Sequence, residues 1–231
     1  MKTNKQISAG LVISIVIFII ATFIGGKVNL KMGLILNSFL THTIMLLLSI
    51  IVIYGLRNYV DYKISLPKFK KIGKPILFGI LATIITNFSL MILSKALGEK
   101  IEPHPILTKM NPVQTFIFIF IYASVAEELL FRGFLLNILK PLNAKGIIIF
   151  KRRISLSVII SAIAFGLSHL ILIITGVGGL FLVRVVIFTT LLGLIAGYYQ
   201  EKNQNNAYAI IVHMAGNLIG VIGSIVLFLN S

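Results

Sequence analysis

Residues 122–134 read Tyr-Ala-Ser-Val-Ala-Glu-Glu-Leu-Leu-Phe-Arg-Gly-Phe and place two adjacent carboxylates, Glu127 and Glu128, and the guanidinium of Arg132 in an apolar run. This run begins at Val113 and includes Phe-Ile-Phe-Ile-Phe-Ile-Tyr. If it is a membrane helix, three such charges facing lipid would cost about 8 to 10 kcal/mol. We therefore expect these three side chains to face protein or trapped water.

The composition indicates a membrane protein. Of the 231 residues, 58% are hydrophobic and only 12% are charged, and the mean hydropathy is +1.03. This balance is far from that of a soluble domain, so we predict an all-α fold, a polytopic transmembrane helical bundle. The formal net charge is +15, but the basic residues lie mostly between apolar runs, so no nucleic-acid partner is predicted. The sequence has no cysteine, which excludes disulfides, thiol nucleophiles and thiolate metal ligands.

Apolar runs predict about seven spans, within a range of six to eight. The first run is long for the apolar region of a cleaved signal peptide and no clear A-x-A site follows it, so we expect a retained helix. With the N-terminus inside, the inner segments hold fourteen Lys and Arg residues, and the outer loops hold five when Lys95 at the outer end of the third span is included. This difference predicts a cytoplasmic N-terminus in a multi-pass protein of a cell membrane. The predicted spans are residues 7–24, 33–56, 75–97, 112–139, 154–175, 180–199 and 207–229.

Two basic segments are predicted to lie in the cytoplasmic headgroup layer. Residues 57–74 carry six basic residues interleaved with aromatic and aliphatic ones, and residues 140–153 carry five around Gly-Ile-Ile-Ile-Phe. Such segments favour the anionic headgroups of the lipid bilayer as a partner, although an ordinary basic loop stays an alternative for residues 57–74. We treat the chain as one membrane domain, in which residues 1–112 supply N-terminal membrane helices with the basic interfacial loop 57–74.

Helix geometry assigns different roles to the two glutamates. Residues i and i+4 nearly align, whereas neighbours diverge by about 100°. Glu128 is therefore the natural salt-bridge partner of Arg132, and Glu127 points elsewhere and is free to accept a proton. The alternative explanation is that these three charges form ion pairs with a purely structural role, although ionisable residues inside membrane spans are usually functional.

Two other predicted spans each contribute a polar side chain in an i, i+4 pair. Phe165 and His169 share a face of the fifth span, and His213 and Asn217 share a face of the seventh. A single histidine in an apolar helix is more often a hydrogen-bonded core residue. Polar residues in i, i+4 pairs on three separate spans, however, together indicate one site. His42, a lone polar residue in the second span, is explained by a local hydrogen bond and is left outside the site.

These residues suit peptide hydrolysis by an activated water. Glu127, helped by His169, could deprotonate the water while His213 and Asn217 donate hydrogen bonds to the oxyanion. Alternatively, Glu127, His169 and His213 could hold a zinc ion that activates the water. The sequence does not decide between these two, so no cofactor is assigned and zinc stays the alternative. There is no H-E-x-x-H and no convincing serine-nucleophile motif.

The predicted depths of these residues constrain the bundle. Measured from the cytoplasmic ends of their spans, Glu127, His169 and His213 lie about 18, 22 and 9 Å deep, at 1.5 Å per residue. A common site therefore requires tilted or offset helices, or span boundaries that differ from the predicted ones by several residues.

At these residues the chain resembles a known family, the CPBP intramembrane proteases, which is the CAAX-prenyl-protease and bacteriocin-processing family, also called the Abi family. The order and spacing of three motifs on successive helices are the specific feature, and the resemblance covers roughly residues 113–229. The motifs are Glu127-Glu128-x-x-x-Arg132, Phe165-x-x-x-His169 and His213-x-x-x-Asn217.

The resemblance implies a membrane-embedded endopeptidase, a hydrolase of the metalloprotease or glutamate type, whose protease core is residues 113–231. Its substrate would be a membrane-associated peptide, a membrane protein or a lipidated tail. The resemblance implies catalytic roles for Glu127, His169, His213 and Asn217, and we count Glu128, Arg132 and Phe165 as supporting residues.

A small chain with no extra domain is similar to the bacterial branch, which implies a bacterial plasma membrane and a role in peptide maturation, bacteriocin self-immunity or surface-protein display. Two other classes stay open from the residues alone. One is a non-catalytic bacteriocin immunity or binding protein, and the other is a proton-coupled transporter.

Overall fold

The computed structural model describes residues 3–28, 37–98 and 110–230. In this part of the chain seven helices are long and apolar enough to cross a membrane, which confirms the predicted helical bundle of about seven spans and makes the chain a multi-pass membrane protein. The spans are α1 (Thr3–Lys27), α2 (Asn37–Gly55), α3 (Gly73–Leu97), a composite fourth span (Pro112–Leu136), α7 (Leu156–Ser168) with the 3₁₀-helix η5 (His169–Thr175), α8 (Gly179–Asn203) and α9 (Ala207–Leu229).

The fourth span, here called the charged span, changes helix type along its length. It starts at α5 (Pro112–Gln114), where the side chains of Asn111 and Gln114 form a capping box. It continues as the π-helix η2 (Thr115–Ala123), the α-helix α6 (Ser124–Glu128) and a second π-helix, η3 (Leu129–Leu136). The wide turns of π-helices are rare and frequently occur at functional sites.

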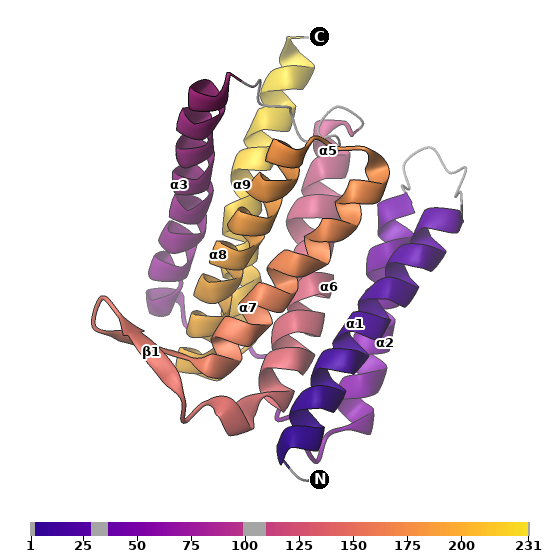
Figure 1. Ribbon diagram of the computed structural model, residues 1–231, viewed down its shortest axis with the longest axis vertical. Helices are drawn as coiled ribbons and strands as arrows, with labels where there is room; N and C mark the ends of the chain where they lie inside the picture. Colours follow the sequence, from indigo (N-terminus) through magenta and orange to yellow (C-terminus); the bar gives the residue numbers. More distant parts are fainter. Residues whose placement is uncertain (1–2, 29–36, 99–109, 231) are drawn as a thin grey trace.

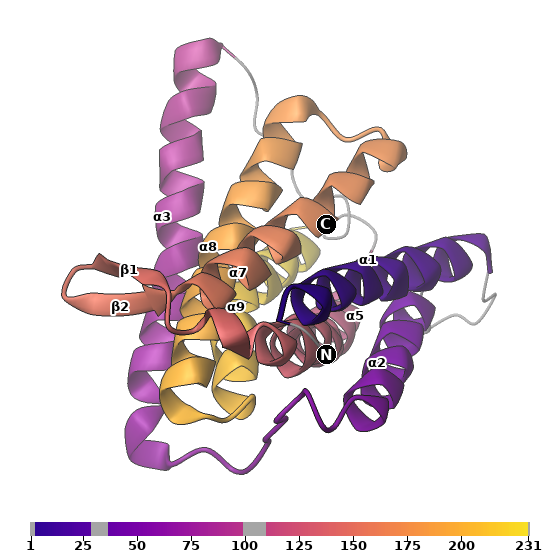
Figure 2. The same cartoon turned by 60° about the horizontal axis from the view of Figure 1, so that its bottom comes forward.

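The charged span runs through the middle of the bundle. The pair α1–α2 packs on one side of it, and α7, α8 and α9 pack on the other, with α3 against α8 and α9 (Figures 1 and 2). Half of the residues in its apolar window are buried, against a third or fewer in each of the other spans. The span that carries the charges is thus the one best shielded from lipid, as the cost of exposing them requires.

Small residues let the helices on the far side of the charged span approach one another closely. A side chain at Gly79 in α3 would meet the backbone of α9, and one at Gly216 in α9 would meet Leu192 in α8. Thr83 Oγ1 in α3 donates a hydrogen bond to the Gly216 carbonyl at 2.7 Å. A side chain at Gly220, one turn further along α9, would meet nothing within 4 Å, so packing depends on Gly216 rather than Gly220.

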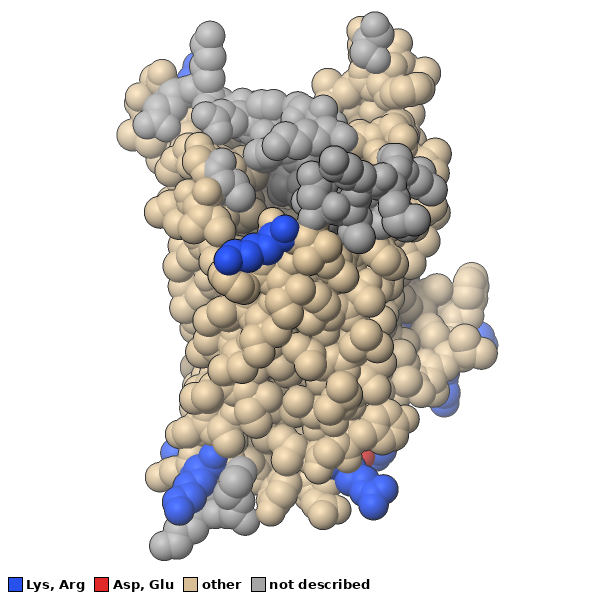
Figure 3. Space-filling view, turned by 90° about the vertical axis from the view of Figure 1, so that its right-hand side faces the viewer, with Lys and Arg blue, Asp and Glu red and all other residues tan. Residues whose placement is uncertain are grey.

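The outer surface of the bundle is mostly apolar. On the face shown in Figure 3, basic side chains lie at the lower end, on the projection at the right and toward the upper end, and the broad middle of the face is nearly free of charged side chains. Such a band is expected where helices contact the hydrocarbon core of a bilayer.

A β-hairpin projects from the end of the bundle that also holds the N-terminus (Figure 1). Its strands β1 (Gly146–Ile149) and β2 (Arg152–Ser155) pair antiparallel, and Phe150 and Lys151 form the turn with positive φ angles of 46° and 63°. A turn of this hand matches the twist of the two strands. The all-α prediction did not include this hairpin, which the β-branched run Gly-Ile-Ile-Ile favours locally.

Residues 60–68, here called the strap, connect the helix pair to α3 across the beginning of α9. The Asn205 side chain accepts a hydrogen bond from the Ser65 backbone nitrogen at 3.2 Å and donates one to the Ser65 carbonyl at 3.0 Å. The hydroxyl of Tyr208 accepts a hydrogen bond from the Lys68 backbone nitrogen at 3.1 Å. Leu66 projects from the strap with 96% of its surface exposed. The segment predicted to be interfacial is therefore an extended strap with a projecting apolar side chain.

Candidate active site

Polar side chains on neighbouring helices bind backbone carbonyls of the charged span. Ser161 Oγ in α7 donates to the Phe131 carbonyl at 2.7 Å, and Gln200 Nε2 in α8 donates to the Arg132 carbonyl at 2.6 Å. Buried carbonyls need such partners, and the irregular bonding of the π-helix η3 leaves them available to side chains. These bonds fix the rotation of the charged span against α7 and α8, and so fix the direction of its charged side chains.

Glu128, Arg132 and His213 form a buried ionic cluster. Arg132 Nη1 lies 2.9 Å from Glu128 Oε1 and both side chains are 0% exposed, so the predicted i, i+4 ion pair is present. Nδ1 of His213, in α9, lies 2.8 Å from the same oxygen. Among the described residues, Glu128 Oε2 and the Nε and Nη2 atoms of Arg132 have no hydrogen-bond partner. Glu128 thus neutralises Arg132 and orients His213, and it has no exposed surface for a substrate.

The ring of Phe165 connects the cluster to the two histidines. The centroid of this buried ring lies 5.1 Å from that of His169 and 5.5 Å from that of His213, and both pairs are edge-to-face. Arg132 Cζ lies 4.5 Å from the same centroid, within range of a cation–π interaction. Gly193 in α8 leaves the space for this packing, because a Cβ atom there would collide with Nη2 of Arg132.

Hydrogen bonds fix the tautomers of His169 and His213. Nδ1 of His169 lies 3.0 Å from the carbonyl oxygen of Phe165, and because a carbonyl only accepts, Nδ1 carries the hydrogen. Nε2 of the neutral His169 ring is then a proton acceptor. Nδ1 of His213 likewise donates to the Glu128 carboxylate, so Nε2 of His213 accepts when the ring is neutral and donates only when the ring is an imidazolium.

Glu127 is the carboxylate that stays accessible. Its side chain is 15% exposed, whereas that of Glu128 is 0% exposed. Glu127 Oε2 lies 3.8 Å from His213 Nε2, which is too long for a direct hydrogen bond. The charged span and α9 bring these two residues together although their predicted depths differ.

His42 also contacts Glu127, although the sequence analysis left it outside the site. Its Nδ1 lies 2.7 Å from the Ser38 carbonyl oxygen, which is the expected local hydrogen bond. Its Nε2 lies 3.3 Å from Glu127 Oε1, and its side chain is only 12% exposed. The local explanation was incomplete, because an imidazole has two nitrogens and the local bond uses one. The available signal was the presence of an ionisable residue inside an apolar span.

The side chain of Asn217 is turned toward the charged span. Its Nδ2 lies 3.1 Å from Ser124 Oγ and 3.3 Å from the Ile119 carbonyl oxygen. The amide nitrogen has two hydrogens, so each has an acceptor within the protein. Asn217 can donate to a substrate oxygen only by exchanging one of these two bonds.

The candidate residues are not arranged as a metal site. Within residues 3–28, 37–98 and 110–230, no three His, Asp or Glu side chains are grouped so that they could hold one metal ion. The structure therefore assigns no metal ion to the alternative zinc set of Glu127, His169 and His213, and this set stays a prediction. Its two imidazoles each use Nδ1 as a hydrogen-bond donor and keep Nε2 as an electron-pair donor, an arrangement that metal-ligating histidines also have.

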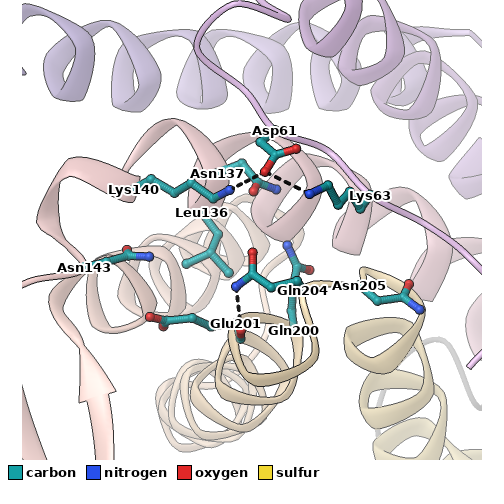
Figure 4. A pocket seen from close by; sticks show the side chains of 10 residues that line it. All are labelled: Asp61, Lys63, Leu136, Asn137, Lys140, Asn143, Gln200, Glu201, Gln204 and Asn205. Carbon is teal, nitrogen blue, oxygen red and sulfur yellow. Dashed lines mark hydrogen bonds and ion pairs between the residues drawn. The ribbon is translucent and has the colours of Figure 1, made fainter. Parts of the chain in front are cut away.

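A small polar pocket lies at the end of the bundle, between the strap, η4 (Lys140–Leu142) and the end of α8 (Figure 4). Asp61 of the strap pairs with Lys140 at 2.9 Å and with Lys63 at 3.3 Å. The hydrogen bond from Lys140 lowers the pKa of the Asp61 carboxyl below its usual value. Glu201 also lines the pocket, so two acidic and two basic side chains balance. The pocket is therefore best explained as the junction that attaches the strap to the bundle. The other lining residues are Leu136, Asn137, Asn143, Gln200, Glu201, Gln204 and Asn205.

Comparison with known proteins agrees with this site. Residues 109–219 match the family model described as type II CAAX prenyl endopeptidase Rce1-like, whereas no curated protein and no solved structure matches the chain. The matched segment contains every motif residue from Glu127 to Asn217 and does not include α1, α2 or α3. Over residues 109–219 the chain is therefore similar to the Rce1-like type II CAAX prenyl endopeptidases, which confirms the predicted resemblance to the CPBP proteases.

Proposed function

We propose that this protein hydrolyses a peptide bond in a membrane-associated peptide by means of a water molecule that Glu127 activates. The family indicates a hydrolase of the CAAX protease type. The observation that supports the residue assignment is the contrast between two adjacent glutamates. Glu128 is buried against Arg132, whereas Glu127 is 15% exposed and has histidine nitrogens at both of its oxygens. A general base needs a proton-accepting group that the reacting water can reach, and Glu127 meets this condition.

In the proposed reaction, Glu127 and His169 orient the water through its two hydrogens. One hydrogen points to the Glu127 carboxylate and the other to Nε2 of His169, the acceptor nitrogen of that ring. As the water oxygen bonds to the carbonyl carbon, its proton passes to Glu127 and the carbonyl electron pair moves to the oxygen. Collapse of this intermediate breaks the C–N bond, and the leaving amine takes the proton from Glu127. The products are a carboxylic acid and an amine.

We assign stabilisation of the oxyanion to His213 and Asn217. His213 can donate from Nε2 when it is an imidazolium, since Nδ1 is already bound to Glu128. Asn217 can donate after it releases Ser124 or the Ile119 carbonyl. Donors directed at the developing negative charge are worth about 2.7 to 4 kcal/mol each in other hydrolases.

We further propose that the N-terminus, the strap and the hairpin lie at the cytoplasmic surface of a bacterial plasma membrane. Phe150 at the hairpin turn is 93% exposed and is followed by Lys151, Arg152 and Arg153, which suits insertion among anionic lipid headgroups. Because the chain has no cysteine, Phe150→Cys provides a single labelling site. A membrane-impermeant maleimide should label it in inverted vesicles and not in intact cells, and the reverse pattern would contradict this orientation.

The function is tested with purified protein in lipid vesicles and two labelled peptides of the same sequence, one of which carries a prenyl group on a cysteine that three further residues follow. Wild type, Glu127→Ala and Glu127→Gln are compared with and without a strong zinc chelator, and thermal unfolding confirms that each variant is folded. We expect cleavage by wild type that the chelator does not change, and a loss of at least about 100-fold in both variants. Faster cleavage of the prenylated peptide would identify a lipidated tail as the substrate.

Other results would overturn parts of the proposal. Loss of wild-type cleavage in chelator would contradict water activation by Glu127 and His169 alone. Absence of cleavage by folded wild type, with a bacteriocin-protection phenotype that survives Glu127→Ala, would identify a non-catalytic immunity or binding protein. Solute uptake that depends on a proton gradient would identify a transporter.

A further inference from the structure

We propose that His42 is a positioning residue for Glu127, so that the N-terminal helices within residues 1–112 complete the site in the protease core, residues 113–231. The proposal rests on the function proposed for Glu127 and adds a residue outside the family match. His42 lies in α2, 85 residues before Glu127 in sequence, and its Nε2 is 3.3 Å from Glu127 Oε1. Both side chains are mostly shielded, with exposed fractions of 12% and 15%.

The hydrogen-bond pattern of His42 requires a proton between these two residues. Nδ1 of His42 lies 2.7 Å from the Ser38 carbonyl, which can only accept, so Nδ1 carries a hydrogen. A neutral His42 would then present the lone pair of Nε2 to a carboxylate oxygen, and two acceptors would repel each other. The contact is favourable only when a hydrogen lies between Nε2 and Oε1. We place this hydrogen on Nε2, because Glu127 must keep its own capacity to accept a proton from water.

The charge of the site supports the same assignment. In the resting site, with His169 and His213 neutral, Glu127 and Glu128 carry two negative charges and Arg132 supplies one positive charge. An uncompensated charge is expensive in a membrane interior. One additional proton on His42 balances the two carboxylates without using the proton-accepting oxygen of Glu127.

The geometry divides the two oxygens of Glu127 between two tasks. Oε1 faces His42 and is held by its N–H group, whereas Oε2 faces His213 at 3.8 Å and has no direct hydrogen bond to it. His42 therefore orients the carboxylate so that Oε2 is the oxygen that accepts the proton of the reacting water. His42 itself forms and breaks no covalent bond to the substrate.

The position of α2 does not depend on His42 alone. Phe39 stacks on Tyr122 with ring centroids 5.1 Å apart, and Thr43 Oγ1 lies 2.8 Å from the Tyr122 hydroxyl oxygen. Thr43 is the residue next to His42 and bonds the same span without a hydrogen bond to Glu127. Thr43→Val is therefore a matched control, because it weakens the docking of α2 and leaves the contact with Glu127 in place.

The test compares wild type, His42→Ala, His42→Gln, Thr43→Val and Glu127→Ala in vesicles, with kcat and KM measured separately on one cleavable peptide. We expect His42→Ala to lower kcat about 10- to 100-fold with KM within about 3-fold of wild type, as for other residues that orient a catalytic group. His42→Gln should recover most of kcat, because its amide can donate an N–H to Glu127 Oε1. Thr43→Val should keep kcat within about 3-fold of wild type.

Each other outcome has a definite meaning. If His42→Ala has the kcat of wild type while Glu127→Ala is inactive, the positioning role is wrong and the function proposed for Glu127 stands. If Thr43→Val loses as much kcat as His42→Ala and His42→Gln recovers nothing, His42 only docks α2 and the positioning role is again wrong. If Glu127→Ala cleaves as well as wild type, the proposed function fails and the role of His42 fails with it.

Discussion

Nδ1 of His213 lies 2.8 Å from Oε1 of Glu128, the same oxygen that receives Arg132 at 2.9 Å. One buried carboxylate oxygen thus holds a cation from its own helix and an imidazole from α9. A histidine donor fixed in this way presents its other nitrogen in one direction, toward Glu127. The buried pair therefore contributes to the site through geometry, while its charges cancel.

Removal of Glu128 should destabilise the fold. Glu128→Ala leaves Arg132 buried without a counter-ion and His213 without its acceptor, and we expect the free energy of unfolding to fall by about 3 to 5 kcal/mol. Thermal or denaturant unfolding in detergent micelles measures this change. Glu127→Ala is the matched control, since Glu127 is partly exposed and has no arginine partner, and it should unfold close to wild type. Equal stability of the two alanine variants would contradict the assigned division between the glutamates.

A methyl group at position 193 in α8 should disturb the packing of the Arg132 side chain and, through it, the site. In Gly193→Ala the new Cβ collides with Nη2 of Arg132, whose Nη1 is held by the ion pair with Glu128, and also lies close to the Ala162 backbone. We expect a loss of about 1 to 3 kcal/mol in unfolding free energy, together with lower cleavage activity. Gly220→Ala is the control, because a Cβ there meets nothing within 4 Å, and it should be neutral or more stable by up to about 1 kcal/mol. A neutral Gly193→Ala would show that Arg132 is not confined as described.

Phe165 should matter for activity through both histidines. Phe165→Leu removes two edge-to-face contacts and the contact with Arg132, and we expect kcat to fall about 10-fold and stability by about 1 to 3 kcal/mol. Phe116→Leu is the control, since Phe116 stacks on Phe120 at 5.2 Å but is 44% exposed. Steady-state cleavage and thermal unfolding measure the two effects. Similar losses in both variants would assign Phe165 an ordinary packing role.

The phenol of Tyr62 in the strap should lose its proton only at a pH well above that of an exposed tyrosine. Burial, with a smaller contribution from Tyr54, raises the pKa of Tyr62 from 10.0 to about 12. Folding therefore favours the neutral phenol, and this contribution to stability is complete below pH 10 and is lost as the pH rises toward 12. The tyrosinate absorbance of wild type minus that of Tyr62→Phe should appear only near pH 12 in the folded protein and near pH 10 after denaturation. A difference that appears near pH 10 in both states would show that the strap does not bury Tyr62.

The sequence was sufficient to predict features that depend on local spacing. The four-residue interval from Glu128 to Arg132 predicted their ion pair, and seven long apolar runs predicted seven spans. Both follow from helix periodicity and from the cost of charge in lipid, which are visible along one chain. The catalytic roles of the motif residues stay predictions, because proximity alone does not demonstrate a role.

Features that depend on distant segments were not predictable in this way. The contact between His42 and Glu127 joins residues 85 positions apart, and no periodicity in either helix indicates the other. The hairpin turn at Phe150 and Lys151 lacks the Asn-Gly pair that normally signals such a turn, so the basic segment was interpreted only as interfacial. The π-helical turns of the charged span also have no composition that separates them from an α-helix.

These π-helical turns have a consequence for aligning related sequences. A π-helical turn accommodates one residue more than an α-helical turn, so a relative that lacks one residue within Thr115–Ala123 can form an α-helix there. The residues on both sides of the turn then keep their faces, including Thr115 with its 3.2 Å contact to Ser224. A one-residue deletion between Glu127 and Arg132 would separate the ion pair itself. Alignments of the family should therefore permit single-residue gaps before Glu127 and none between Glu127 and Arg132.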